Sequence, residues 1–175
     1  MFDKDYRLVG KHAIYVKFLN AYTRNLDKDA KVAGLFANAV DVYMIAPLIG
    51  VAYNIRSPVD TSSDESLNIL AGQIVKRQEQ FDTVYRLVML SEKSVDLSAD
   101  ERIERAFKTD ELPEKVAVNM DLFHEYMRGG VEWLYEQVNE GAILPEDYLE
   151  KIKTIVESYA TDFELSQTDR DADFT

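Results

Sequence analysis

The sequence predicts an all-α fold, a single-domain bundle of about six or seven helices around a central apolar helix at residues 32–55. Two observations lead to this prediction. Apolar residues recur at steps of three and four along most of the chain, which is the period of an amphipathic helix. Strand alternation and Asn-Gly hairpin signals do not stand out, so we expect little or no sheet. We divide the chain into an all-helical domain, residues 1–166, and a flexible, disordered acidic tail, residues 167–175, whose composition is too polar to order itself.

The central segment, VAGLFANAVDVYMIAPLIGVAYNI, is apolar nearly all the way round and carries one formal charge, Asp41. Such a helix needs partners on every side or a bilayer. Asn38 and Asp41 near the middle oppose a membrane span, because a central charge costs about 3 kcal/mol on insertion. Pro47 opposes it as well, since proline kinks or restarts a helix. We therefore predict no membrane span, a buried core helix from Val32 to Ala46, and a second helical piece from Pro47.

The first helix is expected to run from Lys11 to Thr23, after a break at Gly10. Its apolar residues form one stripe at helical spacing, made of Ile14, Phe18, Leu19 and Tyr22. A charged connection, residues 25–31, leads to the central helix. After that helix, residues 57–63 offer hydroxyl caps for the next one.

A long helix is expected from Asp64 to Ser91, opening with two acidic residues that suit the positive end of a helix dipole. The polar pair Arg77 and Gln78 interrupts its apolar face halfway. At this point we expect a hydrogen-bonded or partly wet contact rather than continuous packing.

A short helix over residues 99–108 is expected next, because Ser98 and Glu101 have the spacing of a capping box. One continuous helix from Pro113 to Asn139 follows, since a single apolar phase runs along its length. The last helix is expected to begin at Pro145, after a cap near Gly141, and to end at residue 159 or 163.

Gly129 and Gly130 lie inside the predicted helix 113–139, where each glycine costs about 1 kcal/mol relative to alanine. The structural explanation is the close approach of another helix backbone, around Ala46 and Gly50. The functional explanation is a hinge, and the sequence leaves both explanations open.

Composition excludes several classes of function. The chain of 175 residues has no cysteine, which removes disulfides, thiolate metal sites and cysteine nucleophiles. A formal net charge of −12 opposes nucleic-acid binding through a broad basic face and suits a basic protein partner. The N-terminal residues lack the basic start and apolar run of a secretory signal, so we expect a cytoplasmic protein.

Arg7 and His12 are the candidate catalytic residues. The stretch RLVGKH resembles the Arg-x4-His signature of the HEPN family, whose members are all-helical ribonucleases and nucleotidyltransferase partners. The resemblance covers six residues and implies that Arg7 and His12 act on a phosphodiester. In HEPN proteins the motif usually lies on a late helix, with a polar residue after the arginine, whereas here Leu8 follows Arg7. The alternative is that His12 is an exposed residue at a helix start.

Asp121 and His124 are the candidate metal ligands, because Asp-x-x-His places both side chains on one face of a helix. Di-iron bundles use a related Glu-x-x-His from each of two helices. The second copy is missing, since His12, the other histidine, has Val9 three residues before it. We therefore expect no cofactor and interpret His124 as a surface or half-buried residue.

Asp41 is the candidate buried charge. Inside an apolar helix, an unpaired carboxylate either takes up a proton or finds a partner. A buried ion pair that fixes packing and a substrate-facing acid are the two interpretations. The possible partners are Arg56, Arg77, Arg86 and Arg128.

The chain is rich in tyrosine and phenylalanine, with ten and eight residues. Core packing is the default explanation. Tyrosine, methionine and arginine are also enriched in protein interfaces, which makes five residues candidates for a contact patch. They are Tyr126, Met127, Arg128, Trp133 and Tyr135.

Together these observations predict a non-enzymatic protein that binds a protein partner or itself. It would be a homo-oligomer or an accessory subunit of a larger bacterial-type complex. One form of this hypothesis places the subunit beside a nucleic-acid-processing machine. The first alternative is an all-helical, metal-dependent nuclease or nucleotide hydrolase, using His12 or carboxylate pairs such as Glu132 and Glu136. The second alternative is an acidic inhibitor that mimics nucleic acid.

Overall fold

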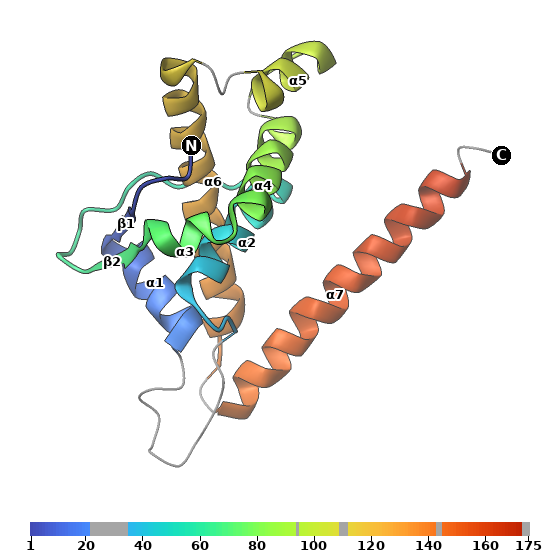
Figure 1. Ribbon diagram of the computed structural model, residues 1–175. Coiled ribbons are helices and arrows are strands. Elements are labelled where there is room, and N and C mark those ends of the chain that lie inside the picture. The colour runs from blue at the N-terminus through green and yellow to red at the C-terminus, as the bar shows by residue number, and fades with distance from the viewer. Residues whose placement is uncertain (22–34, 94, 109–111, 143–144, 173–175) are drawn as a thin grey trace. The chain divides into compact units, whose positions relative to one another are not determined.

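A computed structural model of the chain describes residues 1–21, 35–93, 95–108, 112–142 and 145–172 (Figure 1). These residues form seven helices and one two-stranded sheet, which confirms the predicted all-α class. The chain divides into two compact units, Met1–Tyr135 and Glu136–Thr175. The predicted division at residue 166 stays a prediction. The connection 25–31 and the predicted start of the central helix at Val32 lie outside the described residues.

The sheet pairs β1 (Tyr6–Val9) with β2 (Ser66–Ile69) in antiparallel register, with Leu8 opposite Leu67. Our prediction of helix over residues 66–69 is wrong. Ser66–Ile69 exchanges backbone hydrogen bonds with a segment far away in the chain, and this long-range pairing overrides the local helical pattern. Leu8 and Ile69 are buried, so the ribbon also closes one side of the core.

Helix α1 spans Gly10–Ala21, and Gly10 has a positive φ of 61°. The predicted break at Gly10 is confirmed, because this left-handed conformation favours glycine at the turn from strand to helix. The predicted apolar stripe is rotated from the true one, since Ile14 is 43% exposed. The buried side chains of α1 are those of His12, Ala13, Val16 and Leu19.

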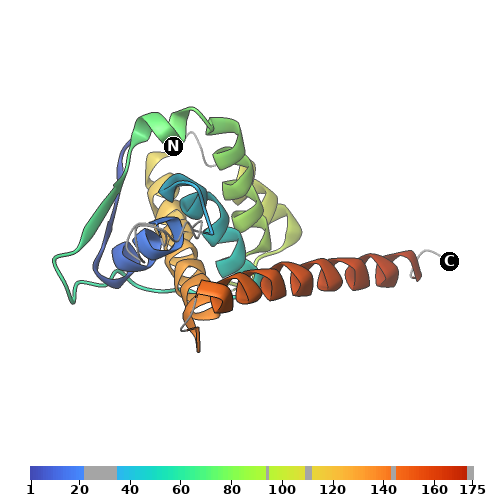
Figure 2. The same cartoon turned by 90° about the horizontal axis from the view of Figure 1, so that it is seen from below.

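Helix α2 (Ala39–Ala52) is the central apolar helix. Figures 1 and 2 show it between α1, α4 (Gln78–Ser91) and α6 (Pro113–Asn139). It begins later than predicted, because residues 35–38 are not helical and Asn38 forms a capping box with Asp41. The predicted break at Pro47 is wrong, since α2 continues through it with Pro47 buried. Packing on several sides holds the helix despite the lost backbone donor. None of the described helices has the length and apolar character that crossing a membrane requires.

The single helix predicted over residues 64–91 is also wrong. The chain instead forms β2, then the short helix α3 (Ala71–Val75), then α4 (Gln78–Ser91). The break falls at Arg77, which has a non-helical backbone, with φ −124° and ψ 28°. It coincides with Arg77 and Gln78, the polar pair at which the sequence predicted an interruption of the apolar face but not of the helix. At this break, the Arg77 side chain forms an ion pair with Asp41 of α2.

Helices α5 and α6 are close to their predicted bounds. Helix α5 (Ala99–Phe107) begins at the predicted capping box, where the Ser98 hydroxyl oxygen accepts a hydrogen bond of 3.3 Å from the Glu101 backbone. Helix α6 (Pro113–Asn139) runs unbroken through its two glycines, as predicted. In the second unit, α7 (Pro145–Ala172) begins at the predicted proline. Its predicted end at residue 159 or 163 is wrong, because the helix continues to Ala172.

Aromatic rings form the centre of the first unit. Phe2 lies 5.2 Å from Phe81 and 5.5 Å from Phe123 between ring centroids, and Tyr43 lies 5.4 Å from Phe81. These rings come from the N-terminal residues and from α2, α4 and α6. Aromatic pairs at such distances add to the stability that burial provides.

Helices α2 and α6 cross with their backbones in close approach. A Cβ at Gly129 would collide with the carbonyl oxygen of Ile55, and one at Gly130 with that of Ala46. Gly50 faces the carbonyl of Tyr126 in the same way. The structure therefore confirms the packing explanation for the glycine pair. Ala46 and Gly50 lie at the contact as the sequence had suggested, whereas the partner of Gly129 is Ile55, beyond the end of α2.

Candidate functional site

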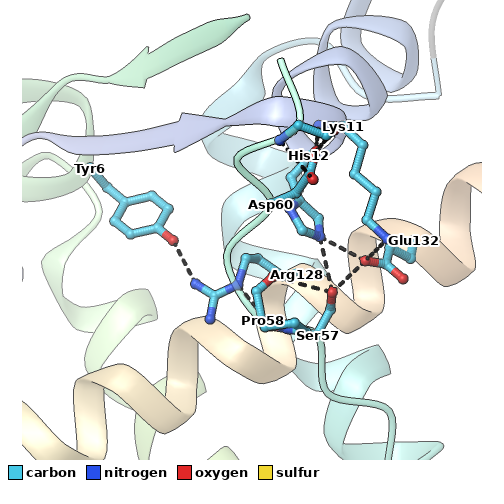
Figure 3. A network of polar contacts seen from close by, with 9 residues as sticks. Tyr6, Lys11, His12, Ser57, Pro58, Asp60, Arg128 and Glu132 are labelled. Atoms are coloured by element: carbon cyan, nitrogen blue, oxygen red, sulfur yellow. Dashed lines mark hydrogen bonds and ion pairs between the residues drawn. The ribbon is translucent and has the colours of Figure 1, made fainter. Parts of the chain in front are cut away.

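A polar cluster links α1 to α6 (Figure 3). His12 Nε2 lies 2.7 Å from Glu132 Oε1 and 3.2 Å from Ser57 Oγ. Lys11 Nζ lies 2.9 Å from the same Glu132 oxygen, and the Ser57 hydroxyl donates to it as well. We call Lys11, His12, Ser57 and Glu132 the His12 cluster. The prediction of an exposed His12 is wrong, because this side chain is 1% exposed.

The His12 cluster contains the residue types of a serine hydrolase but not the geometry. In a catalytic triad the serine and the acid bind opposite nitrogens of the imidazole. Here Ser57 and Glu132 both contact Nε2, and Nδ1 is buried without a hydrogen-bond partner among the described residues. The His12 ring therefore cannot pass a proton from Ser57 on one nitrogen to a carboxylate on the other.

The surroundings lower the pKa of both His12 and Glu132, so the imidazole is neutral and the carboxylate is charged. Burial lowers the pKa of His12, although the hydrogen bond to Glu132 acts in the opposite direction. For Glu132, burial raises the pKa, but hydrogen bonds from Ser57, Lys11 and His12 outweigh it and lower the pKa below its usual value. A neutral imidazole protonated on Nε2 donates to this carboxylate, so the cluster serves to hold α1, the segment after α2 and α6 together.

Arg7 does not join His12. Its exposed guanidinium donates to the Ser66 hydroxyl at 3.3 Å across the β-ribbon. The Arg-x4-His motif spans the junction between β1 and α1, so its two ends do not lie one turn apart on a single helix. The structure thus places the two residues of the HEPN-like motif in different surroundings, one on the ribbon surface and one in the core.

Arg128 makes a second link beside the His12 cluster. Its Nε donates to the Ser57 carbonyl oxygen at 2.8 Å, and a guanidinium nitrogen donates to the Tyr6 hydroxyl at 3.2 Å (Figure 3). Its neighbours on α6, Tyr126 and Met127, are fully buried. These three predicted interface residues therefore point into the first unit, in agreement with the core-packing default.

His124 and Asp121 point to different places. The His124 ring stacks on Tyr6 with centroids 4.0 Å apart, and its Nε2 is hydrogen-bonded to the Tyr43 hydroxyl at 2.8 Å. Asp121 is exposed. Burial, with a contribution from the nearby charge of Arg128, lowers the pKa of His124 to about 3. Across the described part of the chain, no three histidine or carboxylate side chains are grouped as metal ligands.

Asp41 is half-buried in the first turn of α2 and forms an ion pair with Arg77. It also accepts a hydrogen bond of 2.9 Å from the Asn38 backbone. Burial raises the pKa of Asp41, but the bonds from Arg77 and Asn38 outweigh it, so the pKa lies below its ordinary value. Of the four arginines considered as partners, the structure selects Arg77.

A second buried ion pair was not foreseen from the sequence. Glu92, at the end of α4, is 0% exposed and lies 3.1 Å from an Arg105 guanidinium nitrogen. The Tyr126 hydroxyl donates to Glu92 at 3.2 Å, and Arg105 Nε donates to Asn119 Oδ1 at 2.9 Å. In the sequence Glu92 follows a helix within a polar Ser-Glu-Lys stretch and gives no signal of burial.

An open groove lies above this ion pair, between α5 and the start of α6, with a volume of about 830 Å³. We call it the α5–α6 groove. Its apolar lining comes from Val95, Leu97, Leu112 and Val118, and its charged residues are Glu101, Glu104, Arg105, Glu114 and Lys115. Val118 is 64% exposed and lies in the first turns of α6, where residues 113–115 and 117 are exposed as well.

Trp133 and Tyr135, the other predicted interface residues, are partly exposed on α6. Trp133 stacks on Tyr53 with centroids 4.7 Å apart, and Tyr135 stacks on Tyr15 at 3.8 Å. Each ring keeps part of its surface open while its face is covered by a neighbour. A role for these two residues in a protein interface stays a prediction.

A comparison with models of protein families shows to which family the chain belongs. The model of the family described as DNA sulphur modification system-associated protein 4 matches residues 20–174. The chain belongs to this family. Comparisons with curated proteins and with solved structures gave no match.

The part that matches this family includes α2 to α7, and therefore the α5–α6 groove, Glu132 and the buried pair of Glu92 and Arg105. Arg7 and His12 precede it. The family description associates its members with DNA sulphur modification systems, which agrees with the prediction of an accessory protein of a larger system. The family description names no particular partner.

Proposed function

We propose that this protein is an accessory subunit of a DNA sulphur modification system and acts by binding another protein of that system. The observation that carries the proposal is the α5–α6 groove, an open apolar surface on a member of a system-associated family. An exposed apolar surface that is rimmed by polar residues is one mark of a protein-binding site.

The apolar residues of the groove are suited to a protein partner. Val95, Leu112 and Val118 each leave between two fifths and two thirds of their surface open, as their exposures of 49%, 42% and 64% show. Covering such a side chain gains roughly 1 kcal/mol. Three or four of them could therefore form the centre of an interface, with the charged side chains of the groove around it.

The His12 cluster supports a structural role rather than a catalytic one. Its histidine is buried, and its serine and carboxylate share one ring nitrogen. The nuclease alternative remains testable, because it requires cleavage of DNA or RNA by the purified chain and loss of that cleavage in His12→Ala. The nucleic-acid-mimic alternative requires that the chain compete with DNA for a basic partner.

The proposal is tested by measuring binding of the purified chain to each other purified protein of the same modification system, with biolayer interferometry. Val118→Asp alters the groove, and Val59→Asp is the matched control, because Val59 is 55% exposed outside the groove. We expect one protein of the system to bind the wild type and the control with equal affinity. Failure of every protein of the system to bind would overturn the proposal.

A further inference from the structure

The charge around the α5–α6 groove is uneven. Three carboxylates, Glu101, Glu104 and Glu114, and one ammonium, Lys115, line it. Arg105 also reaches the groove, but its charge is balanced by the buried carboxylate of Glu92 at 3.1 Å. The lining is therefore partly apolar and carries more negative than positive charge, and we call Glu101, Glu104 and Glu114 the acidic edge of the groove.

The shape of the groove comes from two helix faces. On α5, Glu101, Glu104 and Arg105 are three and four residues apart and share one face. On α6, Lys115, Val118 and Asn119 share a face in the same way. The apolar part of the lining comes from Val118 on α6 and from the segments that precede α5 and α6, which supply Val95, Leu97 and Leu112. In helix-in-groove complexes, an amphipathic helix lays its apolar face into a groove with such apolar residues.

The groove is already formed in the unbound chain. The hydrogen bond of 2.9 Å from Arg105 to Asn119 links α5 to α6, and the Glu92 ion pair links α5 to the end of α4. Arg102 adds hydrogen bonds to the carbonyl oxygens of Glu92 and Leu97. A partner that binds here does not have to order these elements first, which favours affinity.

We propose that the α5–α6 groove binds an amphipathic helix whose apolar face is flanked by lysine and arginine, on a protein of the same modification system. This inference rests on the proposed function and names the chemistry of the partner. The acidic edge attracts a basic flank and repels an acidic one. Proteins that handle DNA carry clustered lysine and arginine for phosphate contacts, so a basic helix is a common feature of such partners.

The experiment uses the full chain and each purified protein of the system, and it measures Kd at low and at high salt. Val118→Asp tests the apolar lining, with Val59→Asp as its control. Glu104→Lys/Glu114→Lys tests the acidic edge. Its control is Glu79→Lys, since Glu79 and Glu114 both occupy the exposed first turn of a helix and both lose a favourable dipole contact. Circular dichroism verifies that each variant is folded.

We expect Val118→Asp to weaken binding at least about tenfold at both salt concentrations, because a charge would enter the apolar contact. We expect the double lysine variant to weaken binding roughly tenfold at low salt and much less at high salt, since salt screens exposed charges. Hydrogen exchange in the complex should show protection of α5 and the first turns of α6.

The outcomes separate this inference from the proposed function. If no protein of the system binds the wild type, both are overturned. If a protein binds but Val118→Asp leaves its Kd unchanged, the groove is not the site, while the proposed function stands. If Val118→Asp abolishes binding and the lysine variant strengthens it, the helix is acidic and the inference is wrong. Light scattering that shows a dimer of the wild type but a monomer of Val118→Asp would also overturn it, because a second copy of the chain would then occupy the groove.

Discussion

Gly130 of α6 lies so close to Ala46 of α2 that a Cβ at position 130 would collide with the Ala46 carbonyl oxygen. Gly50 of α2 stands in the same relation to the carbonyl of Tyr126 on α6. The central helix α2 and the long helix α6 therefore cross backbone against backbone, with glycine at the contact on both sides. This crossing gives α6 a fixed position, from which it presents Glu132 to His12 and Val118 to the groove.

Gly130→Ala should lower the free energy of unfolding by about 3 kcal/mol, because the added methyl group meets backbone atoms that cannot move aside. Gly72→Ala is the control. Gly72 lies in helix α3, and a Cβ at this position would meet no atom within 4 Å. The control should be neutral or stabilising by up to about 1 kcal/mol. Urea unfolding followed by circular dichroism measures both, and equal stability of the two variants would contradict the close crossing.

Stability should fall as the pH is lowered from 7 to 5, because His124 has a pKa of about 3 in the folded chain and about 6.5 when unfolded. Between these values the unfolded chain binds more protons, so its population rises with acid. For one histidine, the loss between pH 7 and pH 5 is about 2 kcal/mol.

Tyr43→Phe/His124→Phe removes the titrating ring and its hydrogen-bond partner together, so that no buried polar group is left unpaired. The pH dependence of the variant between pH 7 and pH 5 should be weaker than that of the wild type by about 2 kcal/mol. His12, whose pKa is also lowered, is present in both proteins and cancels in the difference. An identical slope in the two proteins would show that His124 titrates normally.

Glu132→Ala should lower the free energy of unfolding by about 2 kcal/mol, since Ser57, Lys11 and His12 all lose the same acceptor and two of them are buried. Glu136→Ala, at an exposed position one turn further along α6, should change it by less than about 0.5 kcal/mol. Thermal and urea unfolding test this prediction. Equal effects of the two substitutions would mean that the His12 cluster contributes little to the fold.

Arg105→Met should be the most destabilising of the charge substitutions, by about 3–5 kcal/mol, because it leaves the Glu92 carboxylate buried and unbalanced. Glu92→Met/Arg105→Met removes both charges and should recover most of that loss. Lys153→Met is the control, because its ion pair with Glu157 is exposed and contributes little. A double variant as unstable as the single one would show that the pair acts through packing rather than charge.

Local patterns were sufficient for the helices whose signals lie within a few residues. The capping box at Ser98, the proline starts and the continuous apolar phase of α6 all describe contacts between near neighbours in the chain. The approach of α6 to Ala46 and Gly50 was also predicted, but the contact of Gly129 with Ile55 was not. For α1 the local pattern failed, since the apolar stripe did not reveal that His12 faces the core while Ile14 faces outward.

The site residues depended on contacts that sequence spacing does not contain. Arg7 and His12 are close in the chain, yet the turn at Gly10 directs them to different surroundings. Glu92 and Arg105 carry no pattern that distinguishes them from surface charges, but they form the ion pair below the groove. The partner of Asp41 was one of four arginines until the break before α4 selected Arg77.

The sequence by itself determined the helical class, the central apolar helix and the long α6, because hydrophobic period, capping and glycine placement act over one or two turns. Only the tertiary structure decided the β-ribbon, the burial of His12 and the open α5–α6 groove. Each of these depends on which distant segments meet, and a surface is left uncovered or a charge is paired only once every helix has its place.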